Sequence, residues 1–151
     1  GTIGVVALLV GGIISGFLVS RDGLKKWILP MALAINLPDL LYVWMAATTP
    51  SSPLFISICV AIEQLGYGFG FTAYMLYLIY IADGEHKTAH YAIGTGFMAL
   101  GMMIPGMPAG WIQVHIGYTY FFIWVCICTI PGIIAAWMIH KRLDESFGRK
   151  V

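Results

Sequence analysis

Charged residues are scarce in this chain of 151 residues, because Asp, Glu, Lys and Arg together make up only 10% of it. Ordinary globular proteins carry roughly 25% of these residues. Hydrophobic residues account for 60% of the sequence, and a soluble domain of this composition would expose large apolar patches that cause aggregation. The composition therefore excludes a soluble globular protein.

Basic stripes and paired cysteines are also lacking. The net charge of +1 argues against nucleic acid as a partner, because domains that bind nucleic acid carry a basic stripe. The three cysteines, Cys59, Cys126 and Cys128, lie inside apolar runs. They therefore indicate neither a secreted disulfide framework nor a thiolate metal site.

Enzyme motifs are absent as well: the sequence contains no Gly-x-Ser-x-Gly elbow, no phosphate-binding Gly-rich loop with Lys and no Cys-x-x-Cys pair. His86 and His90 have the i, i+4 spacing of a metal pair, but they lack the glutamate of the protease motif, and the chain has only four histidines. We interpret them as part of a solvated turn. The sequence predicts no enzyme activity, no metal and no cofactor.

The sequence instead contains long apolar runs. They extend over about 20 residues each, enough for a helix to cross a hydrocarbon core of roughly 30 Å. Barrel strands would show short alternating patterns instead. The sequence therefore predicts an all-α membrane protein with five transmembrane helices, at residues 2–20, 27–47, 54–82, 92–114 and 119–140.

Basic residues alternate with neutral connections along the chain. All eight Lys and Arg residues fall in the first loop (21–26), the third loop (83–90) or the tail (141–150), whereas loops 48–53 and 115–117 have none. Loops rich in Lys and Arg remain in the cytoplasm. We therefore expect the C-terminus to be cytoplasmic. The chain begins Gly-Thr-Ile without Met or a basic leader, and we treat residues 1–151 as a fragment of a longer protein.

Two acidic residues, Asp39 and Glu63, lie inside predicted spans. Each is nine residues from the nearest neutral loop, or roughly 13 Å below that membrane boundary at a rise of about 1.5 Å per residue. A charge at this depth costs at least ~2.5 kcal/mol. We therefore expect both carboxyl groups to face a wet cavity, to have a partner or to hold a proton.

Glu63 begins a stripe of polar and aromatic residues on one helical face. The stripe consists of Glu63, Tyr67, Gly70, Tyr74 and Tyr77, and Gln64 flanks it. A titratable group beside aromatic hydroxyls is suited to binding a polar ligand such as a sugar and coupling its movement to a proton. Gly66, Gly68 and Gly70 are expected to loosen the helix. The alternative is a packing face in which the tyrosine hydroxyls bond to neighbouring helices.

Asp39 follows a proline in the sequence Asn36-Leu-Pro38-Asp39. Pro38 removes a backbone donor, which frees a carbonyl and kinks the helix. One interpretation is a hydrated pocket that joins Asn36 and Asp39 to the region of Glu63. The other is that these two side chains satisfy the broken backbone and a neighbouring helix.

Small residues recur in two other spans. Gly12 and Gly16 are four residues apart, which lets two helices approach closely. In the fourth span we expect a packing face with a bend, formed by Gly101, Pro105, Gly106 and Gly110. Such bends suit segments that rock against a partner bundle, and static dense packing is the alternative.

The loop after the first span resembles the cytoplasmic loop motif of the major facilitator superfamily in its degraded copy between the eighth and ninth helices. Ser20 stands where the motif has an acid, and Leu24 is an extra residue. The resemblance implies a gating loop formed by Gly16, Arg21, Asp22, Gly23, Lys25 and Lys26. The stretch 101–110 likewise resembles the Gly-Pro-rich antiporter motif as it is echoed in the eleventh helix. The five spans would then correspond to helices eight to twelve of that superfamily.

Within this superfamily, residues 66–77, 91–101 and 108–111 resemble the anhydromuropeptide permeases (AmpG type). That resemblance implies proton-coupled import of N-acetylglucosamine–anhydro-N-acetylmuramic acid, with or without peptide, across the bacterial inner membrane. The implied partners are the muropeptide, a proton, the lipid bilayer and a missing N-terminal half. A carrier of another nutrient, a drug or acyl-CoA is the first alternative, and a membrane protein without transport activity is the second.

Overall fold

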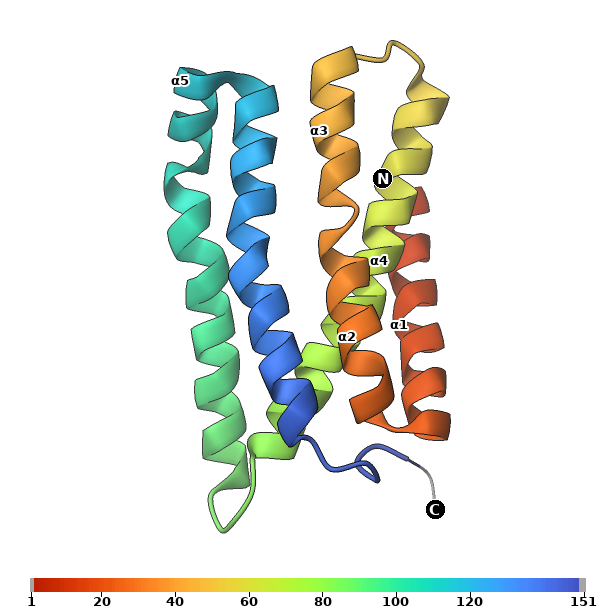
Figure 1. Cartoon of the computed structure of the whole chain (residues 1–151), viewed down its shortest axis with the longest axis vertical. Helices are drawn as coiled ribbons and strands as arrows, with labels where there is room; N and C mark the ends of the chain where they lie inside the picture. The colour runs from red at the N-terminus through yellow and green to blue at the C-terminus, as the bar shows by residue number, and fades with distance from the viewer. Residues whose placement is uncertain (1, 150–151) are drawn as a thin grey trace.

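The protein is an all-helical bundle, described here by a computed structural model over residues 2–149. No strand occurs within this range. The helices are α1 (Thr2–Asp22), α2 (Leu24–Asn36), α3 (Asp39–Thr48), α4 (Pro53–Ile81) and α5 (Lys87–Arg142). Figure 1 shows that they all extend along the long axis of the molecule. The predicted all-α class is confirmed.

Four helical stretches are long and apolar enough to cross a membrane: α1, α2 and α3 taken together, α4 and α5. Their outward-facing side chains are also apolar. Ile13 on α1 is 72% exposed and Met107 on α5 is 81% exposed. Apolar surface of this extent is compatible with hydrocarbon and not with water, so the architecture is that of a multi-pass membrane protein.

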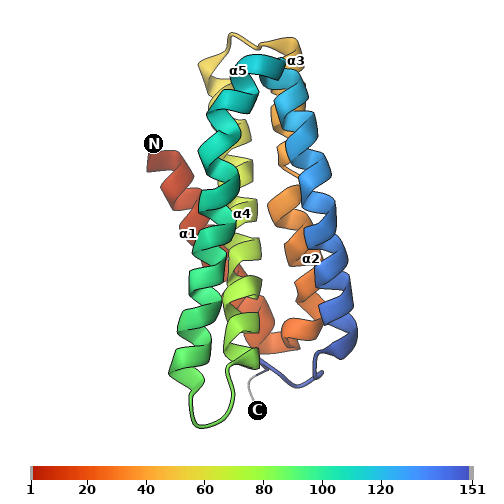
Figure 2. The same cartoon turned by 90° about the vertical axis from the view of Figure 1, so that its left-hand side faces the viewer.

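The last helix, α5, reverses direction at Gly117. Its 56 residues would form a straight rod of about 84 Å, much longer than the ~30 Å of a hydrocarbon core. Gly117 has φ 78° and ψ 165°, a conformation that glycine adopts readily because it has no Cβ. Figures 1 and 2 show two antiparallel arms joined by a turn. The sequence predicts two spans here, 92–114 and 119–140, and the break lies between them.

A second break divides the predicted span 27–47 into α2 and α3. Pro38 has no N–H, so the Ala34 carbonyl loses its usual donor four residues ahead. The backbone N–H of Leu37 donates to the Leu33 carbonyl over 2.8 Å, and the helix then resumes at Asp39. The predicted kink at Pro38 is therefore present as an interruption of the helix.

Three alternate glycines on α4 face two different neighbours. Residues four apart share a helical face, whereas residues two apart point to nearly opposite faces. Accordingly, a Cβ at Gly66 would overlap the Ala34 carbonyl oxygen of α2, and one at Gly70 would lie 2.6 Å from the Met31 carbonyl oxygen. A Cβ at Gly68 would instead overlap a carbonyl oxygen of α1. Backbone therefore packs directly against backbone on both sides of α4.

This packing corrects two predictions about glycine. The glycines of α4 are expected to loosen the helix, but all three are buried in close contacts. On α1, Gly12 and Gly16 are the predicted contact pair. A Cβ at Gly12 would lie 3.9 Å from the Gly68 carbonyl oxygen of α4, whereas a Cβ at Gly16 would meet no described atom within 4 Å. Gly11 makes the closest approach, because a Cβ there would overlap the Leu65 carbonyl oxygen of α4.

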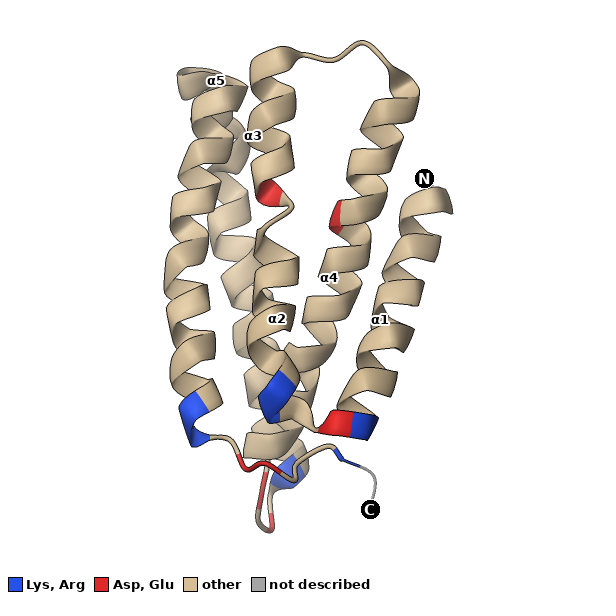
Figure 3. Cartoon of the chain, turned by 45° about the vertical axis from the view of Figure 1, so that its right-hand side comes forward, with Lys and Arg blue, Asp and Glu red and all other residues tan. Residues whose placement is uncertain are grey.

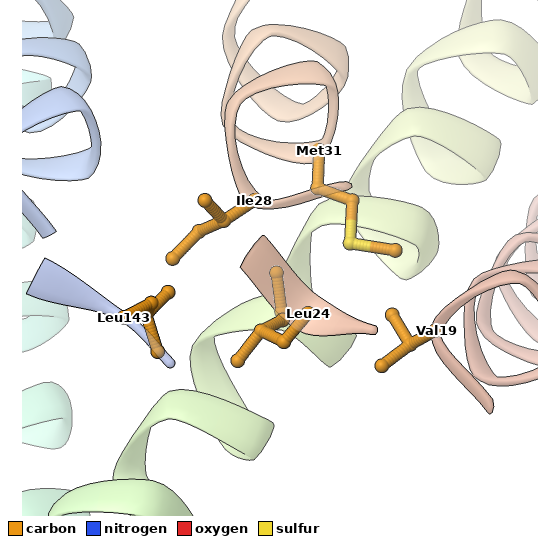
Figure 4. Packing of buried hydrophobic residues seen from close by; sticks show 6 residues of the cluster. Val19, Leu24, Ile28, Met31 and Leu143 are labelled. Atoms are coloured by element: carbon orange, nitrogen blue, oxygen red, sulfur yellow. The ribbon is translucent and has the colours of Figure 1, made fainter. Parts of the chain in front are cut away.

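Most of the deeply buried apolar side chains pack together in one cluster, as Figure 4 shows. Leu24 and Met31 of α2 are fully buried, and they pack with Val19 of α1 and with Leu143, which follows α5. The hydroxyl of Ser15 is also buried and donates to the Met31 sulfur over 3.7 Å. This core holds α1, α2 and the C-terminal segment together.

The basic residues lie at the same end of the bundle (Figure 3). We call this the charged end, defined by residues 21–26, 83–90 and 141–149. The predicted one-sided distribution of Lys and Arg is therefore present in the described chain. Lys150, which belongs to that prediction, lies outside the described residues.

We expect Gly68→Ala to destabilise the bundle, because the added methyl group must push α1 away from α4. Overpacking of this kind costs about 1–3 kcal/mol. Gly96→Ala is the matched control, because a Cβ at Gly96 would meet no described atom within 4 Å and alanine favours helix. Thermal unfolding in detergent should show a lower midpoint for Gly68→Ala and an unchanged or higher one for Gly96→Ala. Equal midpoints would contradict the proposed contact.

Candidate functional site

Glu63 lies half-buried on α4 and is hydrogen-bonded to a residue of α3. Its Oε2 accepts hydrogen bonds from the Tyr42 hydroxyl over 3.4 Å and from the Gln64 amide over 2.7 Å. The ring of Tyr42 stacks on Phe122 of α5, with centroids 5.4 Å apart and planes inclined by 17°. Tyr42 therefore connects the Glu63 carboxylate to two other helices.

Asp39 is the first residue of α3 and is also half-buried. The break at Pro38 places it at the N-terminus of a helix, where the helix dipole stabilises a negative charge. Figure 3 shows the acidic position of α3 and that of α4 at similar heights in the bundle. We call Asp39, Tyr42, Glu63 and Gln64 the polar cluster.

Tyr42 is the member of the polar cluster that the sequence analysis missed. It follows Asp39 by three residues, so both side chains lie on the same face of α3. That spacing was the available signal. Which face of α3 turns towards Glu63 depends on the bend at Pro38, and the sequence alone does not determine it.

The predicted tyrosine stripe lines a cavity of about 450 Å³ between α2, α4 and both arms of α5. Tyr67, Tyr74 and Tyr77 all contribute to its wall, as does Gly70. Glu63 does not line this cavity; it lies one turn away from Tyr67 in the polar cluster. The structure therefore brings the three tyrosines together and leaves the acid beside the cavity.

Asn36 is the other predicted polar residue in the cavity wall. Its side-chain amide donates to the Ala32 carbonyl of its own helix over 2.6 Å. The rest of the wall is mostly apolar, with Ile28, Ile35, Met98 and Met102 among its residues. Apart from Asn36, Tyr67, Tyr74 and Tyr77 are the wall residues that carry a hydrogen-bonding side-chain group.

The predicted gating loop is organised around Asp22 at the end of α1. Its carboxylate pairs with Lys26 over 3.1 Å and with Arg21 over 3.8 Å. It also accepts a hydrogen bond from the indole N–H of Trp27 over 3.1 Å. Asp22 thereby links the end of α1 to the first turn of α2.

The same loop is covered by the C-terminal segment, residues 143–149. Gly23 has φ 89° and lets α2 begin at Leu24, whose N–H donates to the Phe147 carbonyl over 2.9 Å. The Lys25 ammonium pairs with Glu145 over 3.4 Å. From the sequence this segment is predicted only as a basic tail, because contacts between residues about 120 positions apart leave no local pattern in the sequence.

The glycine and proline positions of the fourth span have no packing partner in the described chain. Gly101, Pro105, Gly106 and Gly110 are all exposed. A Cβ at any of the three glycines would meet no described atom within 4 Å, and the backbone stays helical through Pro105. The predicted dense packing is therefore not formed by residues 2–149.

His86 and His90 lie exposed at the start of α5. Within residues 2–149, no group of three or more His, Cys, Asp or Glu side chains is arranged to hold a metal ion. The polar cluster and the tyrosine-lined cavity are therefore the two features of the described chain that combine polar groups with membrane depth.

Comparison with known proteins relates the chain to bacterial transporters. It is 25% identical to a "putative transporter AmpG 1" of Rickettsia bellii over 94% of the chain, which is 34% of that relative. It is 24% identical to the protein of the same name from Rickettsia felis over 93% of the chain and 32% of that relative. With the "anhydromuropeptide permease" of Escherichia coli K12 it shares 23% identity over 95% of the chain and 29% of that protein.

These matches confirm the resemblance to AmpG-type permeases that the sequence motifs indicate. The chain spans about a third of the length of these curated relatives. The relatives are named as transporters or permeases and not as enzymes. No family model matches the chain, and no solved structure matches it significantly.

We expect Leu143→Ala to release the C-terminal segment from the loop between α1 and α2, because Leu143 is 3% exposed. Loss of a buried leucine side chain costs about 2–5 kcal/mol. Hydrogen exchange should become faster in the amides of residues 143–149 and at Leu24. Leu100→Ala is the control, because Leu100 is 49% exposed. The same exchange rates in both variants would show that the segment is not held by this contact.

Proposed function

We propose that this chain is part of a proton-coupled secondary transporter of the major facilitator superfamily, one that imports cell-wall muropeptides across the bacterial inner membrane. The observation that carries the proposal is the similarity to named transporters and permeases over at least 93% of the chain. The two arms of α5 would cross the membrane separately, giving five passes that correspond to helices eight to twelve. An N-terminal half would complete the permeation path, in keeping with relatives about three times as long.

The charged end would face the cytoplasm in this proposal. Its cations attract the anionic lipids of the cytoplasmic leaflet, and loops rich in Lys and Arg are retained on that side. The loop around Asp22 would then act as a cytoplasmic gate. Its ion pairs join α1 to α2, so a relative movement of these helices has to break them.

Proton coupling is assigned to Glu63. Ionised, its carboxylate only accepts hydrogen bonds, as it does from Tyr42 and Gln64; protonated, it also donates one. Taking up a proton also removes a charge that is costly at this depth. Each protonation would therefore change the link between α4 and α3, and Asp39 at the start of α3 would respond to the same change in charge.

The muropeptide is assigned to the aromatic wall next to Glu63. Tyrosine offers an apolar ring and a polar hydroxyl, so it can contact both the ring faces and the hydroxyl groups of a sugar. Tyr67 lies one helical turn from Glu63 on the same face of α4, and Tyr74 continues the wall at 39% exposure. Cargo and proton would thus bind on adjacent turns of one helix.

We expect Glu63→Gln to abolish the pH dependence of uptake, because glutamine keeps the shape of the side chain but cannot release a proton. The assay is uptake of radiolabelled anhydromuropeptide by cells that carry the complete transporter containing this chain and lack their own permease. Proton-driven uptake should fall by roughly tenfold or more, with downhill exchange retained.

Glu85→Gln is the control for this experiment, because Glu85 is an exposed acid at the charged end. Its uptake should match that of the unmodified protein. Unchanged pH dependence in Glu63→Gln would rule out the coupling role. Failure of the unmodified protein to take up anhydromuropeptide, together with uptake of another solute, would contradict the substrate.

Tyr67→Ala and Tyr74→Ala should each reduce muropeptide uptake several-fold more than they reduce the amount of protein in the membrane. Loss of one buried hydrogen-bonding or stacking partner is worth about 1 kcal/mol, or roughly fivefold. Tyr120→Ala is the matched control, because Tyr120 is 70% exposed on α5. A parallel fall in uptake and abundance for Tyr67 and Tyr74 would instead assign them to packing.

A further inference from the structure

A smaller cavity lies at the charged end between α4 and the last turns of α5. Its volume is about 220 Å³, and its wall includes Tyr77 and Tyr80 of α4 with Met138 and Arg142 of α5. The wall is mostly aromatic and apolar, and Arg142 is its charged residue. Such a cavity suits a ligand with a charged head and an apolar body.

This cavity adjoins the larger apolar one. The two share Tyr77, Ala135 and Ile139 as wall residues. A ligand with its head at Arg142 can therefore extend an apolar chain along small and aliphatic side chains towards the middle of the bundle. Neither Glu63 nor Asp39 belongs to either wall.

Arg142 and Arg149 are the described cations of the charged end without a carboxylate or aromatic partner, and of these two Arg142 lines the cavity. Arg21 and Lys26 pair with Asp22, Lys25 pairs with Glu145, and Lys87 pairs with Asp83. The ammonium group of Lys141 lies 3.4 Å from the ring centre of Trp137. No carboxylate among residues 2–149 forms an ion pair with Arg142.

The depth of Arg142 matches that of a lipid head group. Trp137, 50% exposed on the same helix, lies five residues before it, and tryptophan collects at the membrane–water interface. Basic pockets between transmembrane helices bind the head groups of anionic lipids. An unpaired guanidinium at this level faces lipid phosphates when the protein is in a bilayer.

We propose that the groove between α4 and the end of α5 is a binding site for one anionic phospholipid. The phosphate would contact Arg142, and an acyl chain would run past Tyr77, Met138 and Ala135 within the smaller cavity. The larger cavity is left to the proposed substrate, so the lipid site does not depend on which substrate is transported.

One nearby group opposes an anion. Asp144, two residues beyond Arg142, accepts a hydrogen bond from the Tyr80 hydroxyl over 3.1 Å. Its carboxylate repels a phosphate, and it also occupies the Tyr80 hydroxyl. Tyr77, which stacks on Tyr80 with ring centres 6.4 Å apart, therefore supplies the hydroxyl nearest to the lipid. Removing the charge of Asp144 should therefore strengthen lipid binding, whereas removing the charge of Arg142 should weaken it.

Binding of dioleoyl phosphatidylglycerol to the 151-residue chain in detergent, titrated by native mass spectrometry, tests the site. Dioleoyl phosphatidylcholine and glycerol 3-phosphate serve as the neutral lipid and the phosphate without acyl chains. We expect phosphatidylglycerol to bind at least about tenfold more tightly than phosphatidylcholine, and glycerol 3-phosphate to displace neither, because a charge-assisted hydrogen bond and the acyl contacts act together.

Arg142→Gln should weaken phosphatidylglycerol binding by about tenfold, whereas Arg149→Gln, an equal change of charge outside the cavity wall, should stay within about twofold. Asp144→Asn should bind the lipid more tightly than the unmodified chain, and this result decides the question if Arg142→Gln does not fold. Equal losses in the two arginine variants would overturn the proposal in favour of diffuse attraction. Displacement by glycerol 3-phosphate would overturn it in favour of a simple phosphate site.

Discussion

Direct contact between the backbones of neighbouring helices is the constraint on which this bundle depends. Between lipid-facing helices there is no water to exclude, so association relies on close packing and on polar contacts. α4 meets this requirement with alternate glycines that point to opposite sides. Gly68 lies against the backbone of α1, and Gly66 lies against that of α2. The position and height of α4 are thereby fixed by its two neighbours, and so is the height of every side chain on it.

The polar cluster and the tyrosine wall follow from this placement. Gly66 covers the Ala34 carbonyl, which is the group that Pro38 leaves without its helical donor. The broken turn is therefore packed against α4 and not exposed to lipid at this carbonyl. Because the break lies next to α4, the first turn of α3 emerges at the height of Glu63, and Tyr42 can reach its carboxylate.

The sequence predicts those features that depend on one helix at a time. Apolar run lengths indicate the helices, loop charges indicate which ends lie together, and the spacings of seven and three residues between Tyr67, Tyr74 and Tyr77 place them on one face. Features that depend on contacts between two segments are not predicted from the sequence. Gly11 and Gly12 differ by 100° around the same helix, and only the partner helix decides which one makes the closest approach. The hydrogen bond of Tyr42 and the cover formed by residues 143–149 are missed for the same reason.

The interruption at Pro38 gives the two parts of the second span different mechanical roles. A helix bends most easily where a proline removes one of its backbone hydrogen bonds, so α2 and α3 can move as two short helices with a flexible connection at Pro38. α2 is held by the buried core of the charged end. α3 carries Asp39 and Tyr42, and the ring of Tyr42 stacks on Phe122. A tilt of α3 can therefore reposition both polar groups while α2 stays in place.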